Sequence, residues 1–240
     1  MLRFNIDAWN AYAPDLESRD AWQAWLASPF TPDGPVKPAV MKTVPAMLRR
    51  RFTPLGKVAM GAALPLLSDT DSVASVFASR HGDTPLTLEL LQGIGQADPM
   101  SPTAFSLAVH NAVGGLYSIA CKDKSAINAI AASEGLVVQA LLEAVCQLQV
   151  HRRVLCVIYD VVLPELYQPY SQGPDFPHAL ALMISRDGDN GFVLQQRPGV
   201  TDAVESGQDI PDMIALLCGN ADRLSCSVRG AHWLLNRVTR

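Results

Sequence analysis

The sequence contains no cysteine pair of the CxxC type and no long apolar run. The odd number of cysteines, five, is typical of a chain that works under reducing conditions. No uncharged apolar segment of about 18 residues occurs, so we expect no membrane span. The motifs HxxxH, HExxH, GxGxxG and GxxxxGK are also missing, so we expect neither a metal nor a cofactor. These absences predict a cytoplasmic protein.

Charge is also sparse. Charged residues make up 18% of the 240 residues, and 19 basic against 23 acidic side chains leave a net charge of −4. This balance argues against nucleic acid as the main partner. Hydrophobic residues make up 49%, which is enough for a sizeable core. We expect a single domain that spans residues 1–240.

Acidic residues are missing from one stretch, between Asp33 and Asp69. Six basic residues fall within it: Lys37, Lys42, Arg49, Arg50, Arg51 and Lys57. A charge run is usually solvated surface, and that is the simplest interpretation here. The alternative is a surface that binds an anionic partner.

Apolar runs and periodic patterns predict an alternation of strands and helices. Strands are expected at residues 4–12, 72–79, 125–132, 153–163, 179–185 and 192–196. Helices are expected at 19–27, 54–65, 84–94, 103–120 and 136–148, and further helices are expected to close the chain. This order predicts an α/β sandwich whose mixed, largely parallel sheet is covered by helices on both faces.

One strand-turn-helix unit has the form of a nucleophile elbow. Residues 131–135 read Ala-Ala-Ser-Glu-Gly, an A-x-S-x-G pattern that places Ser133 near a helix amino terminus. Ser133 is a candidate nucleophile, but a serine before an apolar helix is more often its cap. His110 is a candidate base, although a lone histidine on an apolar helix is more often a hydrogen-bonded core residue. Asp160 interrupts an apolar strand, and we expect this carboxylate to have a structural partner.

Several segments occur in an order known from one family of enzymes. FNIDAWNAYAP and SRDAWQAWLA match an opening strand, turn and helix, and RRRFTPLGKVAMGAALPLL matches an arginine-bearing segment with the helix after it. SVASVFAS and MSPTAFSLAVHNAVGG match the next strand and the helical segment that follows. Together they resemble β-ketoacyl synthases of the thiolase fold, and among these the short ketosynthase-like proteins of the chain-length-factor type. The resemblance implies a thiolase-like layered sandwich that corresponds to one ketosynthase half.

At the catalytic position the sequence departs from this family. Catalytic members carry a cysteine at a buried helix amino terminus, followed by one or two small residues and a glycine. Counting back from Gly135, that position is Ala132, and none of the five cysteines falls near it. Catalytic members also carry two histidines in a second half, and this chain has no comparable half. The resemblance therefore implies no independent condensation activity.

The resemblance instead implies a role as a partner. It points to a non-catalytic subunit in a heterodimer with a full-length β-ketoacyl synthase, in a type II fatty acid or polyketide pathway, aryl polyene synthesis included. Family dimers pair through the region that corresponds to residues 103–120 and the helix after Gly135. Because the acyl carrier protein is acidic, the resemblance implies docking on basic residues: Arg49, Arg50, Arg51 and Lys57. The same arginines alternatively form ion pairs with the partner synthase.

Two alternatives of other classes stay open. The first is an acyltransferase or thioesterase-like enzyme in which Ser133 is the nucleophile and His110 or another histidine is the base. The second is a scaffold that binds a carrier protein without a synthase. Substituting Ser133 tests the first, and reversing the charge of the arginine cluster tests the second.

Overall fold

The computed structural model describes residues 1–68, 72–170, 175–186, 191–197 and 209–238. Its strands are β1 (Leu2–Tyr12), β2 (Ala74–Ser79), β3 (Ile127–Ala131), β4 (Arg153–Asp160), β5 (His178–Ser185), β6 (Gly191–Arg197), β7 (Arg223–Val228) and β8 (Ala231–Arg237). Its α-helices are α1 (Arg19–Ala27), α2 (Ala46–Arg49), α3 (Pro54–Ala63), α4 (Thr84–Gly95), α5 (Pro102–Leu107), α6 (Ala112–Cys121), α7 (Leu136–Gln147) and α8 (Asp209–Cys218). Three short 3-10 helices are η1 (Ala39–Thr43), η2 (Leu64–Leu66) and η3 (Gln168–Tyr170).

These strands form one sheet in the order β3-β2-β4-β5-β1-β6-β8-β7. Only β2 pairs in parallel, with β3 on one side and β4 on the other, while the remaining described neighbours are antiparallel. The mixed α/β sheet is confirmed, but the expectation of a largely parallel one is wrong. Parallel neighbours need a crossover connection, usually a helix. Helices α4, α5 and α6 connect β2 to β3, and α7 carries the chain from β3 across β2 to β4, whereas β4–β5 and β7–β8 are joined without an α-helix in the described residues.

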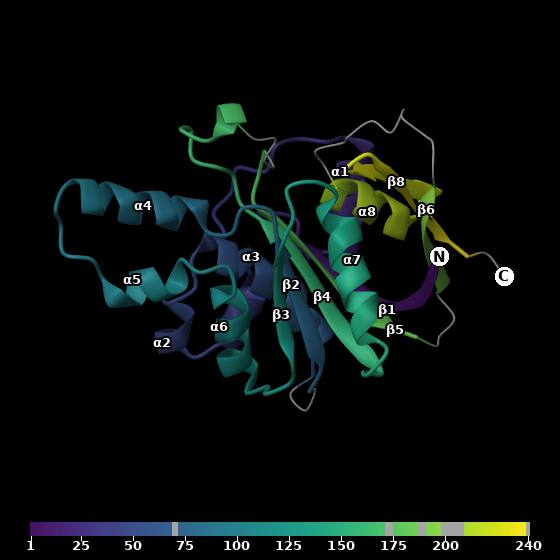
Figure 1. Cartoon of the computed structure of the whole chain (residues 1–240), viewed down its shortest axis with the longest axis horizontal. Coiled ribbons are helices and arrows are strands. Elements are labelled where there is room, and N and C mark those ends of the chain that lie inside the picture. Colours follow the sequence, from purple (N-terminus) through teal and green to yellow (C-terminus); the bar gives the residue numbers. More distant parts are fainter. Residues whose placement is uncertain (69–71, 171–174, 187–190, 198–208, 239–240) are drawn as a thin grey trace.

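Helices cover both faces of the sheet (Figure 1). On one face, α1, α7 and α8 pack on the side chains of β4 and β5 that include Cys156 and Leu182. On the other face, α3 and α6 pack on the alternate side chains, which include Val157 and Ala181. Strands β2, β4 and β5 lie in the middle of this sandwich and are buried along almost their whole length. Their continuous apolar runs are typical of strands covered on both faces.

Capping residues explain where several helices begin. Ser18 accepts a hydrogen bond from the N–H of Ala21 at the start of α1, and Thr53 accepts one from Gly56 before α3. Asp83 accepts one from Leu86 before α4. Each satisfies a backbone donor that a helix amino terminus leaves unpaired.

The helix expected over residues 103–120 is in fact two helices, α5 and α6, separated by a turn at 108–111. The turn redirects the chain so that α6 lies close to the sheet. A β-carbon on Gly114 would lie only 2.9 Å from Cγ2 of Ile127, so glycine permits this close approach. Helices α4 and α5 contain no buried residue and project from the body as an arm (Figure 1).

The end of the chain also differs from the expectation. Instead of closing helices, α8 is followed by the β7–β8 hairpin, which extends the sheet beyond β6. Apolar residues alternate along β7, with Leu224 and Cys226 buried and the residues between them more exposed. That alternation is the pattern of a strand with one covered face.

Candidate functional site

The elbow expected from the sequence forms between β3 and α7. Ala132 is buried, with 7% of its surface exposed, whereas Ser133 and Glu134 are exposed. The N-cap of α7 is Gly135, whose φ of 55° lies in the left-handed region that favours glycine. No side chain caps this helix. The interpretation of Ser133 as the cap is therefore wrong, because the turn continues for two residues beyond it.

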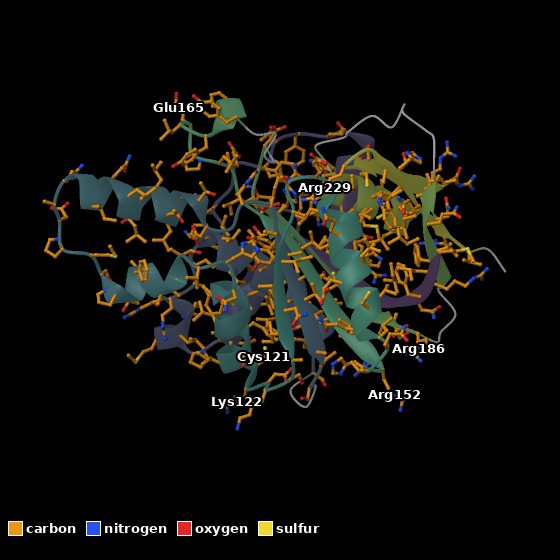
Figure 2. All side chains as sticks on the ribbon, viewed as in Figure 1. Cys121, Lys122, Arg152, Glu165, Arg186 and Arg229 are labelled. Carbon is orange, nitrogen blue, oxygen red and sulfur yellow. The ribbon has the colours of Figure 1, made fainter. Side chains whose placement is uncertain are left out.

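The C-terminal hairpin packs against this elbow. A β-carbon on Gly135 would collide with Cγ2 of Val228 and would lie 3.3 Å from Sγ of Cys226. At the turn of the hairpin, the backbone N–H of Arg229 donates to Oε2 of Glu134 at 3.0 Å. Figure 2 shows Arg229 beside the end of α7 at which the helix begins. Sequence reasoning missed this contact, because it joins residues 95 positions apart.

His110, the candidate base, lies near the end of β3, where its side chain bonds to a backbone carbonyl group and not to Ser133. Its Nε2 atom is 2.6 Å from the carbonyl oxygen of Ile130. A carbonyl only accepts, so Nε2 carries the proton and Nδ1 is the free acceptor. Nδ1 faces Gly82, lying 3.0 Å from where a β-carbon on that residue would be. In the described part of the chain, no hydrogen bond joins Ser133 to a histidine.

Asp160 has the structural partners expected of a buried carboxylate. Its Oδ1 atom accepts from Oγ of Ser79 at 3.0 Å and from the N–H of Arg80 at 2.9 Å. The Ser79 hydroxyl in turn accepts from the N–H of Gly82 at 2.9 Å. Burial raises the pKa of Asp160 to about 6, while the hydrogen bonds from Arg80 and Ser79 act in the opposite direction. This network fixes the turn between β2 and α4.

His178 stands opposite Asp160 in the register of β5 with β4. Its Nδ1 atom lies 2.8 Å from the carbonyl oxygen of Phe176, so that nitrogen carries the proton. Burial lowers the pKa of His178 to about 4, and the imidazole is therefore neutral near neutral pH. Asp160 and His178 are therefore both buried at the end of the sheet beside the elbow, and each is hydrogen-bonded to its own partners.

The basic cluster is split between a pocket and open surface. Arg49, Arg50 and Lys57 line a pocket of about 350 Å³ between η1, α2 and α3, together with Lys37 and Lys42. Arg51 is exposed and does not line it. Docking on this cluster stays a prediction, and the sequence did not indicate that Lys37 and Lys42 share one pocket with the arginines.

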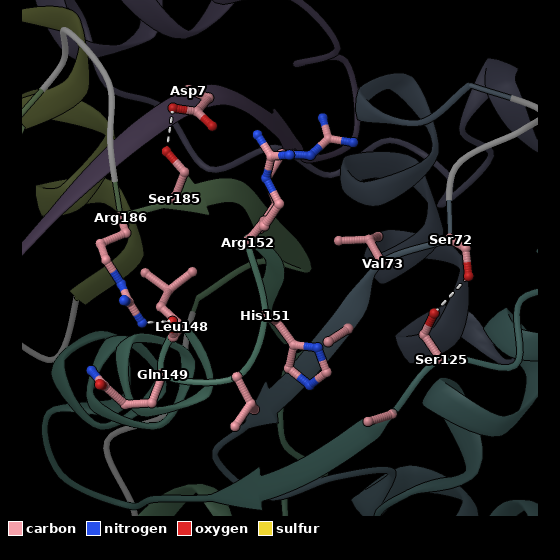
Figure 3. Close-up of a pocket in the computed structure, with 14 residues that line it drawn as sticks. Asp7, Ser72, Val73, Ser125, Leu148, Gln149, His151, Arg152, Ser185 and Arg186 are labelled. Atoms are coloured by element: carbon pink, nitrogen blue, oxygen red, sulfur yellow. Dashed lines mark hydrogen bonds between the residues drawn. The ribbon is translucent and has the colours of Figure 1, made fainter.

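A second pocket, of about 910 Å³, lies at the opposite end of the sheet from the elbow (Figure 3). Arg152 and Arg186 lie there, at the far end of α7 from the hairpin turn (Figure 2). Nη2 of Arg186 donates to the carbonyl oxygen of Leu148 at the end of α7, and Oγ of Ser185 donates to Oδ1 of Asp7 at 2.8 Å. Among the histidines left open as a base, the pocket contains His151, and it contains neither Ser133 nor His110.

Two further observations concern ligands and membranes. Among the residues that the structure describes, no group of three or more His, Cys, Asp or Glu side chains is placed to hold a metal ion. Within the same ranges, no helix has the length and apolar character needed to cross a bilayer.

The family model for the β-ketoacyl synthase N-terminal domain matches residues 22–234. This chain belongs to the β-ketoacyl synthase family. The sequence resemblance is thereby confirmed, and so is the thiolase-like α/β sandwich, which solved ketosynthase structures share. A search of curated proteins found no match.

Three solved structures show how similar the fold is. The structure of the ketosynthase ApeO with its chain length factor ApeC, from Xenorhabdus doucetiae, contains a chain with 26% identity and a TM-score of 0.81, over 99% of this chain and 100% of that one. The ishigamide ketosynthase/chain length factor gives 12% identity and a TM-score of 0.64, over 92% of this chain and 72% of that one. The complex AntDE:AntF, a type II polyketide synthase acyl-carrier protein with its ketosynthase, gives 15% identity and a TM-score of 0.54, over 82% of this chain and 70% of that one.

Proposed function

We propose that this chain is a non-catalytic ketosynthase-like subunit of the chain-length-factor type. It pairs with a full-length β-ketoacyl synthase in a type II fatty acid or polyketide pathway, with aryl polyenes among the candidate products. The observation that carries the proposal is the buried Ala132 at the elbow. By the count back from Gly135, this alanine takes the position of the family's cysteine, and a methyl group cannot attack a thioester.

The free edge of β3 supports pairing with a second subunit. Among the described strands β3 pairs only with β2, so its outer edge offers backbone N–H and C=O groups to another chain. Its sequence, Ile-Asn-Ala-Ile-Ala, contains no charge and no proline to prevent such pairing. Beside the edge, α6 exposes 59% of Ile119, and no described side chain fills the space in front of Gly115. A partner could therefore approach α6 closely.

Exposed apolar side chains continue from α6 onto α5. Phe105 is 58% exposed and Val109 is 49% exposed, which is unusual for large apolar residues that lie close together. By contrast, α7 buries its apolar face within its own chain, where Leu141 and Ala144 are fully covered. We therefore place the interface on residues 103–120 and β3, and no longer on the helix after Gly135.

The basic surface near α2 supports docking of an acyl carrier protein. Arg50 and Arg51 are exposed, and Arg49 and Lys57 are half-buried beside them. An acidic carrier would be attracted to this surface and oriented by it, since complementary charge raises encounter rates. Charge reversal of Arg50 and Arg51 should then weaken carrier binding and leave synthase pairing intact.

The experiment that tests the proposal is an acylation assay with acyl-carrier and acyl-CoA donors, read by mass spectrometry of the intact chain. We expect no acyl adduct on this chain, with or without the partner synthase, and condensation by the synthase only when both subunits are present. An adduct that disappears in Ser133→Ala would contradict the proposal and favour the acyltransferase alternative. Binding to carrier protein without any pairing to a synthase would favour the scaffold alternative.

A further inference from the structure

The pocket between η1, α2 and α3 has an unusual lining. It is formed by eight residues: Val36, Lys37, Pro38, Met41, Lys42, Arg49, Arg50 and Lys57. Five of these eight are cationic and none is acidic. Like charges brought this close repel one another, so an anion that enters the pocket relieves an existing cost as well as forming new contacts.

No described carboxylate neutralises these five cations. None of them forms an ion pair within the described ranges. The neighbouring carboxylate of Glu17 accepts from the backbone N–H of Ala39 at 3.2 Å and does not line the pocket. The positive charge is therefore available to a ligand.

The pocket also has an ordered wall and an apolar floor. Nη1 of Arg49 donates to the carbonyl oxygen of Met41 at 3.4 Å, which holds this guanidinium against the wall. Val36, Pro38 and Met41 line the pocket beside the cations and form its apolar floor. A ligand with an anionic group and a short organic segment would match both parts.

Charge and geometry favour a phosphate over a carboxylate. A phosphate group carries up to two negative charges and three strong acceptor oxygens, whereas a carboxylate carries one charge and two oxygens. Arginine binds phosphate through two parallel hydrogen bonds, and lysine adds a point charge. Several cations and an apolar floor therefore fit a phosphate ester better than a free carboxylate or bare inorganic phosphate.

We propose that this pocket is a binding site for a phosphate ester. Lys37, Lys42, Arg49 and Arg50 hold the phosphate, and the organic group lies on the apolar floor. The site is distinct from general docking on the arginine cluster, because it includes two lysines outside that cluster and excludes Arg51. It does not depend on pairing with a synthase. The ester is either a free phosphate monoester or the prosthetic arm of a carrier protein, whose phosphodiester has one charge and two non-bridging oxygens and is therefore the weaker fit.

The test uses methionine methyl groups labelled with ¹³C, observed by NMR during titration with n-butyl phosphate at constant ionic strength. Met41 reports from the floor of the pocket, and Met47, which is 84% exposed on α2, is the internal control. We expect a saturable shift of the Met41 methyl signal and none of Met47. Burial of the butyl group should make binding of inorganic phosphate about tenfold weaker. n-Butanol should give no shift.

Two exposed cations provide matched variants. Lys42→Gln removes a cation that lines the pocket and should weaken binding about tenfold, as expected for a lost hydrogen bond to a charged group. Arg51→Gln removes a neighbouring cation outside the pocket and should leave affinity within about twofold. Equal weakening by both variants, or a Met41 signal that does not move, would overturn the proposal, because the attraction would then be diffuse or absent.

A comparison of free 4′-phosphopantetheine with holo- and apo-acyl carrier protein identifies the source of the ester. If holo-carrier binds more tightly than apo-carrier and Lys42→Gln abolishes the difference, the carrier's arm enters the pocket. Saturable binding of the free compound with equal binding of the two carrier forms assigns the pocket to a small molecule. Equal binding of both carrier forms with no response to the free compound would contradict a phosphate site.

Discussion

Val228, near the end of the chain, occupies the space that a β-carbon on Gly135 would need at the elbow. Val228 is the last residue of β7, and Gly135 is the N-cap of α7. The neighbouring residues, Arg229 and Glu134, add a hydrogen bond to this contact. The hairpin therefore packs directly on the turn that leads into α7. The C-terminal hairpin therefore contributes to the packing of the elbow.

Gly135→Ala should destabilise the chain by about 2 to 4 kcal/mol, because the left-handed backbone disfavours alanine and the new methyl group collides with Val228. Urea unfolding measures the effect. Gly115→Ala is the control, since that helical glycine faces open space and alanine there should stabilise the isolated chain by about 0.5 to 1 kcal/mol. Equal effects at the two positions would show that the hairpin does not pack on the elbow.

Ser133→Ala should leave stability within about 0.5 kcal/mol of the parent, because Ser133 is exposed and Gly135 is the N-cap of α7. Unfolding in urea gives this value, and the acylation assay on the same variant shows whether any chemistry depends on the hydroxyl. A loss of about 1 kcal/mol or more would restore the interpretation of Ser133 as a helix cap.

Asp160→Asn should change how stability depends on pH. Burial raises the pKa of Asp160 from 3.8 to about 6, so the folded chain keeps this proton to higher pH than the unfolded chain does. The parent therefore loses stability as pH rises from about 4 to about 6, and the asparagine variant lacks that loss. Relative to the variant, the parent should lose up to about 3 kcal/mol between pH 4 and pH 7.

Urea unfolding of both proteins at several pH values checks this. The lowered pKa of His178 has the opposite effect, since stability falls as the unfolded imidazole gains a proton on acidification, but it is present in both proteins and cancels in the difference. A difference in stability that does not change with pH would mean that Asp160 has the same pKa in the folded chain as in the unfolded chain, and would contradict the account.

Ile119→Glu should weaken pairing with the partner synthase at least about tenfold, because it places a charge at the proposed interface beside β3. Leu166→Glu is the matched control: Leu166 is 59% exposed, as Ile119 is, and lies in the connection between β4 and β5, so its substitution should leave pairing unchanged. Analytical ultracentrifugation of each variant mixed with the synthase measures the affinity of pairing. If the two variants pair equally well, the interface lies elsewhere.

Local patterns were sufficient to predict the middle of the fold. The apolar run of β4, the serine before α1 and Pro54 at the start of α3 are local signals. They were sufficient to predict the starts of both helices and a strand at 153–163, which ends three residues earlier in the structure. The parallel bias of the sheet was predicted wrongly, because strand direction depends on which connections cross over.

The candidate site shows the same division. The turn between β3 and α7 could be predicted from the local sequence around Gly135, but the contact of Val228 with that glycine joins distant segments and leaves no local signal. Likewise, Lys37 and Lys42 precede the arginine cluster by several residues, and only the folding of η1 against α3 brings them into one pocket. The break at 108–111 was missed because Val109, Ala112, Val113 and Leu116 keep the i, i+3, i+4, i+7 spacing of a helix across it.

The central claim is that this chain works as the inactive partner of a catalytic synthase. Native mass spectrometry of the tagged chain, purified from its own cells, tests it most directly. The account predicts a 1:1 complex with a longer β-ketoacyl synthase that carries the catalytic cysteine and both histidines, with no acyl mass on this chain. A monomer or homodimer that takes up an acyl group from carrier or CoA donors would contradict it.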